Sequence, residues 1–370
     1  MTGTFTITLE HVKAPVTVAN FIGLATGQHG WLELSTGRIR HEPFYDGIIF
    51  HRVIAGFMSQ VGSRAGDGTD GPGYSFRDEF DPTLRHSGPY VVSMANSGKH
   101  TNGSQIFITA AATPNLDDKH AVFGTVTAGQ AVCDQINSTA TTGSGGVPAD
   151  RPLNPIVIRS IQIHGASLTA FDLRPAGLPK VLNAQPRLSR QGASYLLTFD
   201  ALPFSALRGY HSDDLFRWTP FRASYSGATT ASANQQDVTA LATGMTHFFR
   251  MARVAYGETA AKFVPASVGG RNFTFTSNFP FVSDVVFNAA GTGGTWTLRN
   301  SGSGAIKTAT YTPGQFTSQL YMRWDSTTAY GFDLEFLYTL DHAAPNSGRL
   351  TGETNANGYS SVVGSFVSGP

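Results

Sequence analysis

The first residues of the chain alternate between apolar and hydroxyl-bearing side chains. In TFTITLE, residues 4–10, every second position is apolar, which is the pattern of a strand with one buried face. The next segment, residues 14–27, changes to helical spacing, with Pro15 in a position that suits the first turn and Gly27 in one that suits the end of a helix. We therefore expect a strand followed by an amphipathic helix that lies on a sheet.

Short apolar runs separated by Gly, Asp and Asn turns dominate residues 45–136. The runs GIIFHRVI, YVVSMA, SQIFITA and AVFGTVTA have the length of strands, so this part is expected to be antiparallel β-structure closed into a barrel. The polar and mixed stretch 28–43 predicts a loop insertion or a short hairpin. Residues 131–138 can form a second helix, and the period-2 pattern of residues 153–165 predicts one more strand.

The composition changes after a first domain that we place at residues 1–165. Residues 166–186 are rich in Pro, Gly, Ala and Leu without sustained periodicity, and they predict a linker. Strand-like runs with polar turns follow, so residues 187–268 predict a small β-sandwich and residues 269–370 a second accessory β-domain. The expected fold class is therefore mainly β.

Composition and charge exclude several classes of function. The 370 residues are 41% hydrophobic and 14% charged, with a formal net charge of +1 and no run of Lys and Arg, so a nucleic-acid partner is not expected. Cys133 is the only cysteine, which excludes an intramolecular disulfide and a thiolate-rich zinc site. No segment approaches the roughly 18 consecutive apolar residues of a membrane span.

The same composition bears on the compartment. The surface is supplied largely by Thr, Ser, Asn, Gln and Gly, which favours an exported protein, periplasmic or extracellular, over a cytoplasmic one. Because a strand pattern begins almost at Met1, we expect the natural product to continue upstream, with any export signal removed.

Three segments carry the most informative motifs. They are YDGIIFHRVIAGFMSQVGSRAGDGTDGPGYSFRDEF at residues 45–80, VSMANSGKHTNGSQIFIT at residues 92–109 and LDDKHAVFGTV at residues 116–126. Together with the helix motif APVTVANFIGLATG, they resemble the cyclophilins in order and spacing over about residues 3–165. The resemblance implies a peptidyl-prolyl cis-trans isomerase built on an eight-stranded antiparallel β-barrel capped by two helices. It implies no cofactor and no metal.

Isomerisation of a prolyl bond requires that amide resonance be weakened. The rotational barrier of about 18–20 kcal/mol arises from that resonance, and lowering it by about 5 kcal/mol accelerates rotation roughly 10⁴-fold. No nucleophile, metal or proton transfer is needed. A donor to the prolyl nitrogen and an apolar surface that holds the ring are sufficient, provided that the twisted amide is bound best.

The resemblance assigns roles to individual residues. It implies that Arg52 is the catalytic arginine, and a guanidinium suits this role because it is a rigid donor fork that stays charged. The other residues implied in catalysis are Gln60, Phe57 and His51. The residues implied in substrate binding, as a proline pocket and as polar groups that orient the peptide, are Met58, Ala95, Asn96, Gln105, Phe107, Leu116 and His120.

The expected partners are proline-containing peptides and unfolded proteins, bound by a monomer. Asn115 stands where many family members carry Trp, so the resemblance does not by itself extend to cyclosporin binding. A second class of function stays open, in which the first domain is a proline-peptide binding or scaffold module and the C-terminal β-domains recognise a partner or a surface.

Other interpretations of single features are less favoured. The glycine-rich segment GSRAGDGTDGPG lacks the GK[ST] of a phosphate-binding loop. No EF-hand spacing is present, so we expect a solvated loop rather than a calcium site at the carboxylates Asp67, Asp70, Asp78, Glu79 and Asp81. Core packing is expected rather than a sugar or peptide platform for the aromatic residues Trp218, Phe248, Phe249, Trp296 and Trp324.

Overall fold

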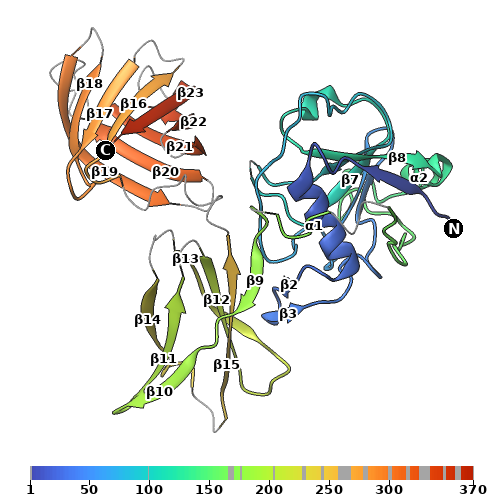
Figure 1. Ribbon diagram of the computed structural model, residues 1–370, viewed down its shortest axis with the longest axis horizontal. Coiled ribbons are helices and arrows are strands. Elements are labelled where there is room, and N and C mark those ends of the chain that lie inside the picture. The colour runs from blue at the N-terminus through green and yellow to red at the C-terminus, as the bar shows by residue number, and fades with distance from the viewer. Residues whose placement is uncertain are drawn as a thin grey trace. The chain divides into compact units, whose positions relative to one another are not determined.

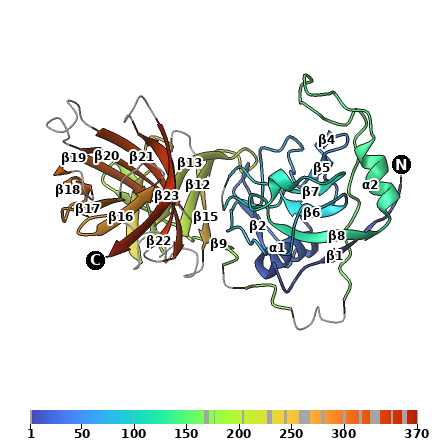
Figure 2. The same cartoon turned by 90° about the horizontal axis from the view of Figure 1, so that it is seen from above.

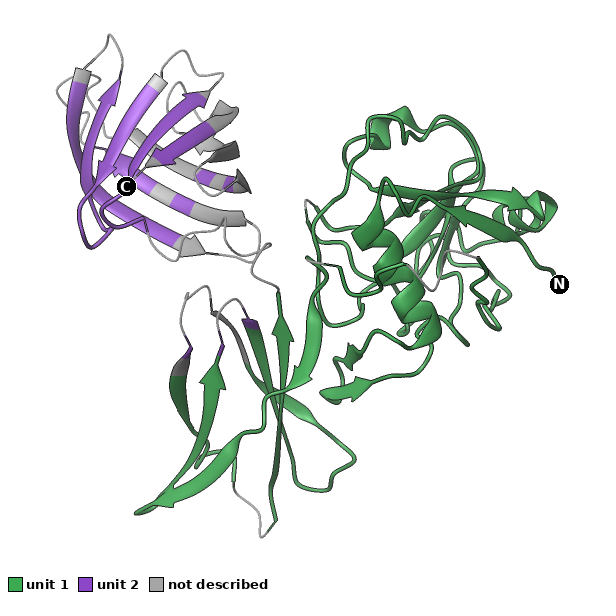
Figure 3. Ribbon diagram, viewed as in Figure 1, with its two compact units in different colours: residues 1–201, 206–224, 232–257 green, residues 202–205, 225–231, 258–370 purple. Residues whose placement is uncertain are grey.

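A computed structural model shows the chain as two compact units (Figure 3). The first comprises residues 1–201, 206–224 and 232–257, and the second comprises residues 202–205, 225–231 and 258–370. The structure describes residues 2–98, 100–165, 171–175, 177–202, 205–226, 231–242, 246–256, 268–277, 282–298, 302–313, 317–324, 334–344, 347–354 and 360–369.

The N-terminal part of the first unit is built on one antiparallel sheet (Figures 1 and 2). Its six strands follow the order β1-β8-β6-β7-β5-β4. Their bounds are β1 Thr6–Leu9, β4 Arg52–Ile54, β5 Met58–Val61, β6 Val91–Met94, β7 Ile106–Thr109 and β8 Val122–Ala128. The predicted mainly β architecture with two helices is confirmed for this part. The expected closed barrel of eight strands is not found there among the described residues, because the six strands form a sheet whose edge strands β1 and β4 are not paired with each other.

The insertion at residues 28–43 forms the short hairpin that was one of its two predicted forms. Strands β2 (Trp31–Glu33) and β3 (Arg38–Arg40) pair with each other. The backbone N–H of Leu32 donates to the carbonyl of Pro72 at 2.9 Å. This bond attaches the hairpin to the glycine-rich loop that follows β5.

Helix α1 (Pro15–Thr26) agrees with its sequence signals. Pro15 opens the helix, and Gly27 ends it with a φ of 74°, a left-handed value that glycine adopts without steric cost. The N-terminus is capped from a distant segment, because the carboxylate of Glu79 accepts hydrogen bonds from the backbone N–H groups of Val16 and Thr17 at 3.1 and 2.6 Å. Phe21 packs the buried side of the helix near Phe123 of β8, with ring centroids 5.5 Å apart.

Helix α2 (Gln130–Asn137) forms where the second helix was predicted, whereas the strand predicted over residues 153–165 was wrong. That segment makes a single bridge, between Val157 and Ile49, flanked by hydrogen bonds from the N–H of Phe50 to the carbonyl of Ile156 and from the N–H of Ile158 to the carbonyl of Ile48. Residues 159–165 form no further bridge among the described residues, so the segment does not extend into a strand.

Two further sheets complete the first unit. One contains β10 (Arg187–Gln191), β11 (Ser194–Ala201) and β14 (Ser232–Asp237); the other runs β13 (Thr219–Ser226), β12 (Ser205–Ser212), β15 (Phe248–Ala255) and β9 (Lys180–Asn183). They share an apolar core that includes Leu197, Phe199, Leu207 and Met251. Strand β9 forms within residues 166–186, which were predicted to be a linker, because it finds a pairing partner in β15.

The second unit contains a closed antiparallel barrel of eight strands, in which β23 pairs with β16. Trp296 and Trp324 lie inside it, 2% and 1% exposed, with their rings stacked 5.0 Å apart. These two aromatic residues are core, as predicted. The strands are β16 Asn272–Ser277, β17 Val282–Phe287, β18 Gly294–Leu298, β19 Gly302–Pro313, β20 Thr317–Trp324, β21 Leu334–Ala344, β22 Ser347–Thr354 and β23 Ser360–Gly369.

None of the helices among the described residues combines the length and the apolar character that crossing a membrane requires.

Candidate functional site

Strand register brings four of the predicted site residues onto one face of the N-terminal sheet. Arg52 of β4 lies opposite Gln60 of β5, and Gln60 lies opposite Phe107 of β7. Directly opposed residues of antiparallel strands carry their side chains on the same face. Met58, two positions before Gln60 on the same strand, shares this face because side chains alternate along a strand. A cation, an amide and an apolar side chain therefore form one row across the strands, and Met58 lies beside this row on the same face.

The cation in this row is accessible from solvent. The side chain of Arg52 is 45% exposed, and its Nε lies 3.7 Å from Oδ2 of Asp150, whose side chain is 14% exposed. A guanidinium has five donors and no acceptor, so contact at Nε leaves the two terminal amino groups to bind another ligand. Arg52 can thus offer charged donors above the sheet.

The amides next to the arginine are held by each other. Nε2 of Gln60 donates to Oε1 of Gln105 at 2.9 Å, and Nε2 of Gln105 donates to the backbone carbonyls of Gly68 and Asp70 at 2.8 and 2.9 Å. Gly68 has a φ of 82°, and a side chain added there would reach the ring of His51. The glycine loop therefore sets the orientation of both glutamine amides.

The apolar part of the site centres on the Phe107 ring. His86 stacks on it with centroids 5.8 Å apart, and His120 meets it edge-on at 5.5 Å. Nδ1 of His120 lies 2.9 Å from the carbonyl oxygen of Met94, which holds that ring in place. Phe107 and Met58 are 4% and 3% exposed, so they can form the floor of an apolar surface and Phe57, which is half-buried, can form part of its wall.

The remaining predicted residues lie on two segments that are bonded to each other. Ala95 donates its backbone N–H to the carbonyl of Gln105 at 2.9 Å, and Nδ2 of Asn96 donates to the carbonyl of Lys119 at 2.8 Å. Leu116 ends the short 3-10 helix Pro114–Leu116, and its carbonyl accepts from the N–H of His120. These contacts join the end of β6 to the loop before β8, so both segments border the Phe107 ring.

His51 is the predicted polar residue with the least access to a ligand. It is 5% exposed, and neither of its ring nitrogens has a hydrogen-bond partner among the described residues. Burial lowers the pKa of His51, and the carboxylates of Asp67 and Asp70 oppose this only in part. The ring is therefore neutral near pH 7 and lies against Gly68.

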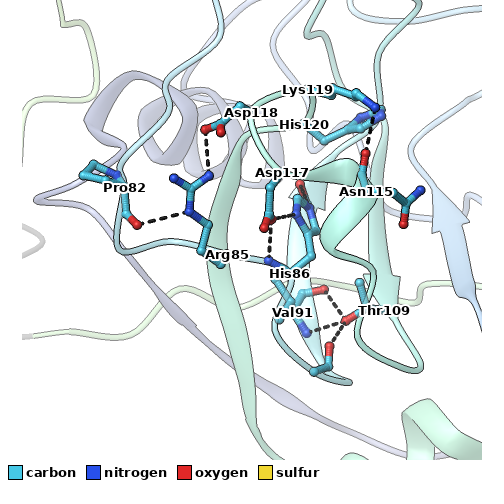
Figure 4. A network of polar contacts seen from close by, with 12 residues as sticks. Pro82, Arg85, His86, Val91, Thr109, Asn115, Asp117, Asp118, Lys119 and His120 are labelled. Carbon is cyan, nitrogen blue, oxygen red and sulfur yellow. Dashed lines mark hydrogen bonds and ion pairs between the residues drawn. The ribbon is translucent and has the colours of Figure 1, made fainter.

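Sequence reasoning missed a polar network that lies beside the Phe107 ring. Nδ1 of His86 lies 2.8 Å from Oδ1 of Asp117, and Nε2 lies 3.0 Å from Oγ of Ser93 (Figure 4 shows the pair of His86 and Asp117). Burial lowers the pKa of His86, so the ring is neutral, donates from Nδ1 to the carboxylate and accepts from the hydroxyl. Burial acts to raise the pKa of Asp117, but hydrogen bonds from His86 outweigh it and the net pKa is lowered.

This Ser, His and Asp arrangement supports the site rather than performing chemistry. Ser93 is fully buried and lies opposite Phe107 in the sheet. A serine nucleophile must reach a substrate carbonyl, and Ser93 has no such access. The network instead holds the His86 ring on which Phe107 stacks. Sequence reasoning missed the pair His86 and Asp117 because the two residues lie far apart along the chain, where no local pattern joins them.

Other cavities and acidic groups do not add a second site. A cavity between α2 and the sheet is lined by Ser59, Ile108 and Cys133, on the face opposite to the Arg52 row. Burial raises the pKa of Cys133 to about 11, so its thiol is unreactive near pH 7. Among the described residues, no cluster of His, Cys, Asp and Glu has a geometry that could hold a metal ion.

Comparisons with known proteins match this part of the chain. The family model described as cyclophilin type peptidyl-prolyl cis-trans isomerase/CLD matches residues 1–163. Peptidyl-prolyl cis-trans isomerase A of Mycobacterium tuberculosis is 48% identical over 163 residues, which are 44% of this chain and 87% of that protein. Peptidyl-prolyl cis-trans isomerase B of Streptomyces anulatus is 47% identical over 164 residues, 44% of this chain and 91% of that protein.

Among solved structures, a cyclophilin type peptidyl-prolyl cis-trans isomerase of Cryptosporidium parvum is similar to the same share of the chain. Its identity is 28% and the TM-score is 0.37, and the match covers 44% of this chain and 91% of that one.

Proposed function

Because this chain belongs to the cyclophilin family and is a peptidyl-prolyl cis-trans isomerase, we propose that Arg52 is the group that lowers the barrier to rotation about the Xaa-Pro bond. As the prolyl amide twists, its nitrogen becomes pyramidal and gains a lone pair that can accept a hydrogen bond. A charged donor placed at that nitrogen binds the twisted amide more tightly than either planar form, which is the condition for catalysis.

The apolar residues around Phe107 hold the proline ring during this rotation. Met58 and Phe107 form the floor of the pocket, and Phe57, Leu116 and His120 form its walls. A proline ring has no N–H to satisfy, so an apolar pocket suits it. The support for this part is the packing of Phe107 against two imidazole rings, one stacked and one edge-on, which keeps the floor of the pocket rigid.

The polar residues hold the peptide on the other side of the rotating bond. Gln60 and Gln105 are oriented by the glycine loop, while Ala95 and Asn96 border the pocket from β6. Binding the residue before proline in one orientation converts the rotation into motion of the prolyl side alone. His51 supports the loop that orients the glutamines, from its buried position against Gly68.

One observation carries the proposal, namely the register that sets Arg52 opposite Gln60 and Gln60 opposite Phe107. The test is an exchange NMR assay on a short peptide with one Xaa-Pro bond. Arg52→Ala should lower kcat/KM by about 10²- to 10³-fold, as expected for loss of a charged donor to a developing lone pair. Arg52→Lys should recover only part of the rate because the donor fork is lost.

A matched control is available in the same sheet region. Arg85 also forms an ion pair with an aspartate, at 2.7 Å from Asp118, and is 36% exposed. Arg85→Ala should keep the wild-type rate. Equal rates for wild type and Arg52→Ala would end the assignment of Arg52.

We also propose that the active species is a monomer and that it binds cyclosporin weakly. Every residue assigned above comes from one chain, so a second copy is not needed to complete the site. Asn115 is exposed on the 3-10 helix beside Leu116, and its carbonyl accepts from Nζ of Lys119 at 2.9 Å (Figure 4). A short polar side chain at this position offers little apolar area to a large apolar ligand.

A further inference from the structure

The loop that follows α2 brings one carboxylate to the exposed arginine. Oδ2 of Asp150 lies 3.7 Å from Nε of Arg52. We propose that Asp150 is a positioning residue for the Arg52 guanidinium: it attracts the Nε side, so that the two terminal amino groups are directed at the peptide. The inference rests on the proposed role of Arg52.

The backbone on either side of Asp150 is held in place by hydrogen bonds. The carbonyl of Asp150 accepts from the N–H of Val53 at 2.8 Å, one residue after Arg52, and the N–H of Asp150 donates to the carbonyl of Gly143 at 2.9 Å. Oγ1 of Thr142 accepts from the N–H of Arg151 at 3.0 Å and donates to the carbonyl of Pro148 at 2.6 Å. The loop is thus a built structure attached to β4, and the carboxylate moves with the strand that carries the arginine.

The backbone of Asp150 has a conformation that residues other than glycine rarely adopt. Its φ is 56°, in the left-handed region, where a residue other than glycine is held only if its surroundings determine it. Asp and Asn tolerate this region better than other side chains do. This backbone conformation occurs at the loop residue whose carboxylate pairs with Arg52.

The contrast in exposure between the two partners indicates what the pair does. The Asp150 side chain is 14% exposed, whereas that of Arg52 is 45% exposed. A pair with one exposed partner contributes little to stability because water screens it. Its effect is instead to restrict a long, flexible side chain before the substrate arrives, which reduces the entropy lost on reaching the transition state.

Positioning of this kind predicts a loss in turnover without a loss in peptide binding. Among the described residues, no hydrogen bond or ion pair joins Phe57, Met58 or Phe107 to the loop of Asp150. We therefore expect Asp150→Asn to lower kcat by about tenfold while the Kd for a proline peptide changes by less than about twofold. Asn keeps the shape and tolerates the left-handed backbone, so the variant removes the charge alone.

The control variant is Asp118→Asn. Asp118 also has a left-handed φ, 58°, and also pairs with an arginine, Nη1 of Arg85 at 2.7 Å. The same substitution at this residue should leave kcat and Kd unchanged. Asp150→Gly is the second test variant, because glycine relieves the backbone strain and keeps the loop folded even if Asn does not.

The experiment measures kcat and Kd by NMR line shapes of a proline peptide in the full chain, together with the Nε–H signal of Arg52, assigned by its loss in Arg52→Ala. The expected result is a fall in kcat and a shift of that signal in both Asp150 variants, and no further fall when Asp150→Asn is added to Arg52→Ala. If kcat stays within about twofold of wild type or rises in both variants while Arg52→Ala is inactive, the positioning role is overturned and the role of Arg52 stands. Wild-type activity in Arg52→Ala would instead overturn the proposed function itself.

Discussion

His29 makes the stability of the N-terminal part depend on pH. Its side chain lies before the β2–β3 hairpin, is 7% exposed and meets the Tyr74 ring edge-on at 5.4 Å. Burial lowers the pKa of His29 from 6.5 to about 4, a hydrogen bond to the backbone of Pro179 opposes this in part, and Arg174, His41 and Lys180 add to it. The ring is neutral in the folded state near pH 7.

The sign and size of the effect follow from linkage. The unfolded chain binds a proton at His29 with a pKa near 6.5, and the folded chain does so only near 4. The stability that depends on a neutral His29 ring is therefore complete above pH 6.5 and is lost as the pH falls toward 4. At about 1.4 kcal/mol per pH unit over a difference of about 2.5 units, the full loss is about 3 kcal/mol. Between pH 7.5 and 4.5 we expect a loss of about 2 to 3 kcal/mol from this residue.

The assay combines a titration with an unfolding series. The ring protons of His29 are followed by NMR from pH 3 to 8 and assigned by their absence in His29→Phe, which keeps an aromatic ring against Tyr74. Urea unfolding of both proteins, monitored by amide signals of β6 and β7, then gives the free energy of unfolding at pH 7.5 and 4.5. His51 and His86, whose pKa values burial also lowers, are present in both proteins and cancel in the comparison.

The variant should lose about 2 to 3 kcal/mol less stability than wild type between pH 7.5 and 4.5, because a phenyl ring binds no proton. A His29 titration centred between pH 6 and 7, or an equal pH dependence in the two proteins, would refute the reasoning.

The remaining predictions concern the cap of α1 and the drug site. Glu79→Ala should lower the free energy of unfolding by about 2 kcal/mol, because two backbone N–H groups at the N-terminus of α1 lose their acceptor. Glu79→Gln should lower it by about half as much. Urea unfolding measures both variants, and stability equal to that of wild type would contradict the capping role of Glu79. Asn115→Trp should tighten cyclosporin binding at least about tenfold by adding apolar contact, measured by calorimetry, with unchanged affinity contradicting the proposed cause of weak binding.

Local elements were predictable from the sequence because their causes lie within a few residues. Pro15 and Gly27 are the two ends of α1 for reasons of backbone geometry alone. The members of the candidate site came from motifs that resemble the cyclophilins in order and spacing, and the strand register sets Arg52 opposite Gln60 and Gln60 opposite Phe107. Local patterns were insufficient where a pairing partner decides whether a strand forms. Residues 153–165 make one bridge, to Ile49, whereas β9 forms inside the expected linker because β15 pairs with it.

The chain's own pattern of apolar and polar residues thus determined the mainly β class and the two helices, and the motifs that resemble the cyclophilins supplied the set of site residues. Tertiary structure alone decided which side chains and strands contact each other. Asp150 reaches Arg52, Glu79 caps α1, and β23 closes the barrel on β16 across long stretches of chain. Such contacts depend on the folded path of the backbone and on the exclusion of water around buried groups such as His29 and His86, and neither is encoded within a local window of sequence.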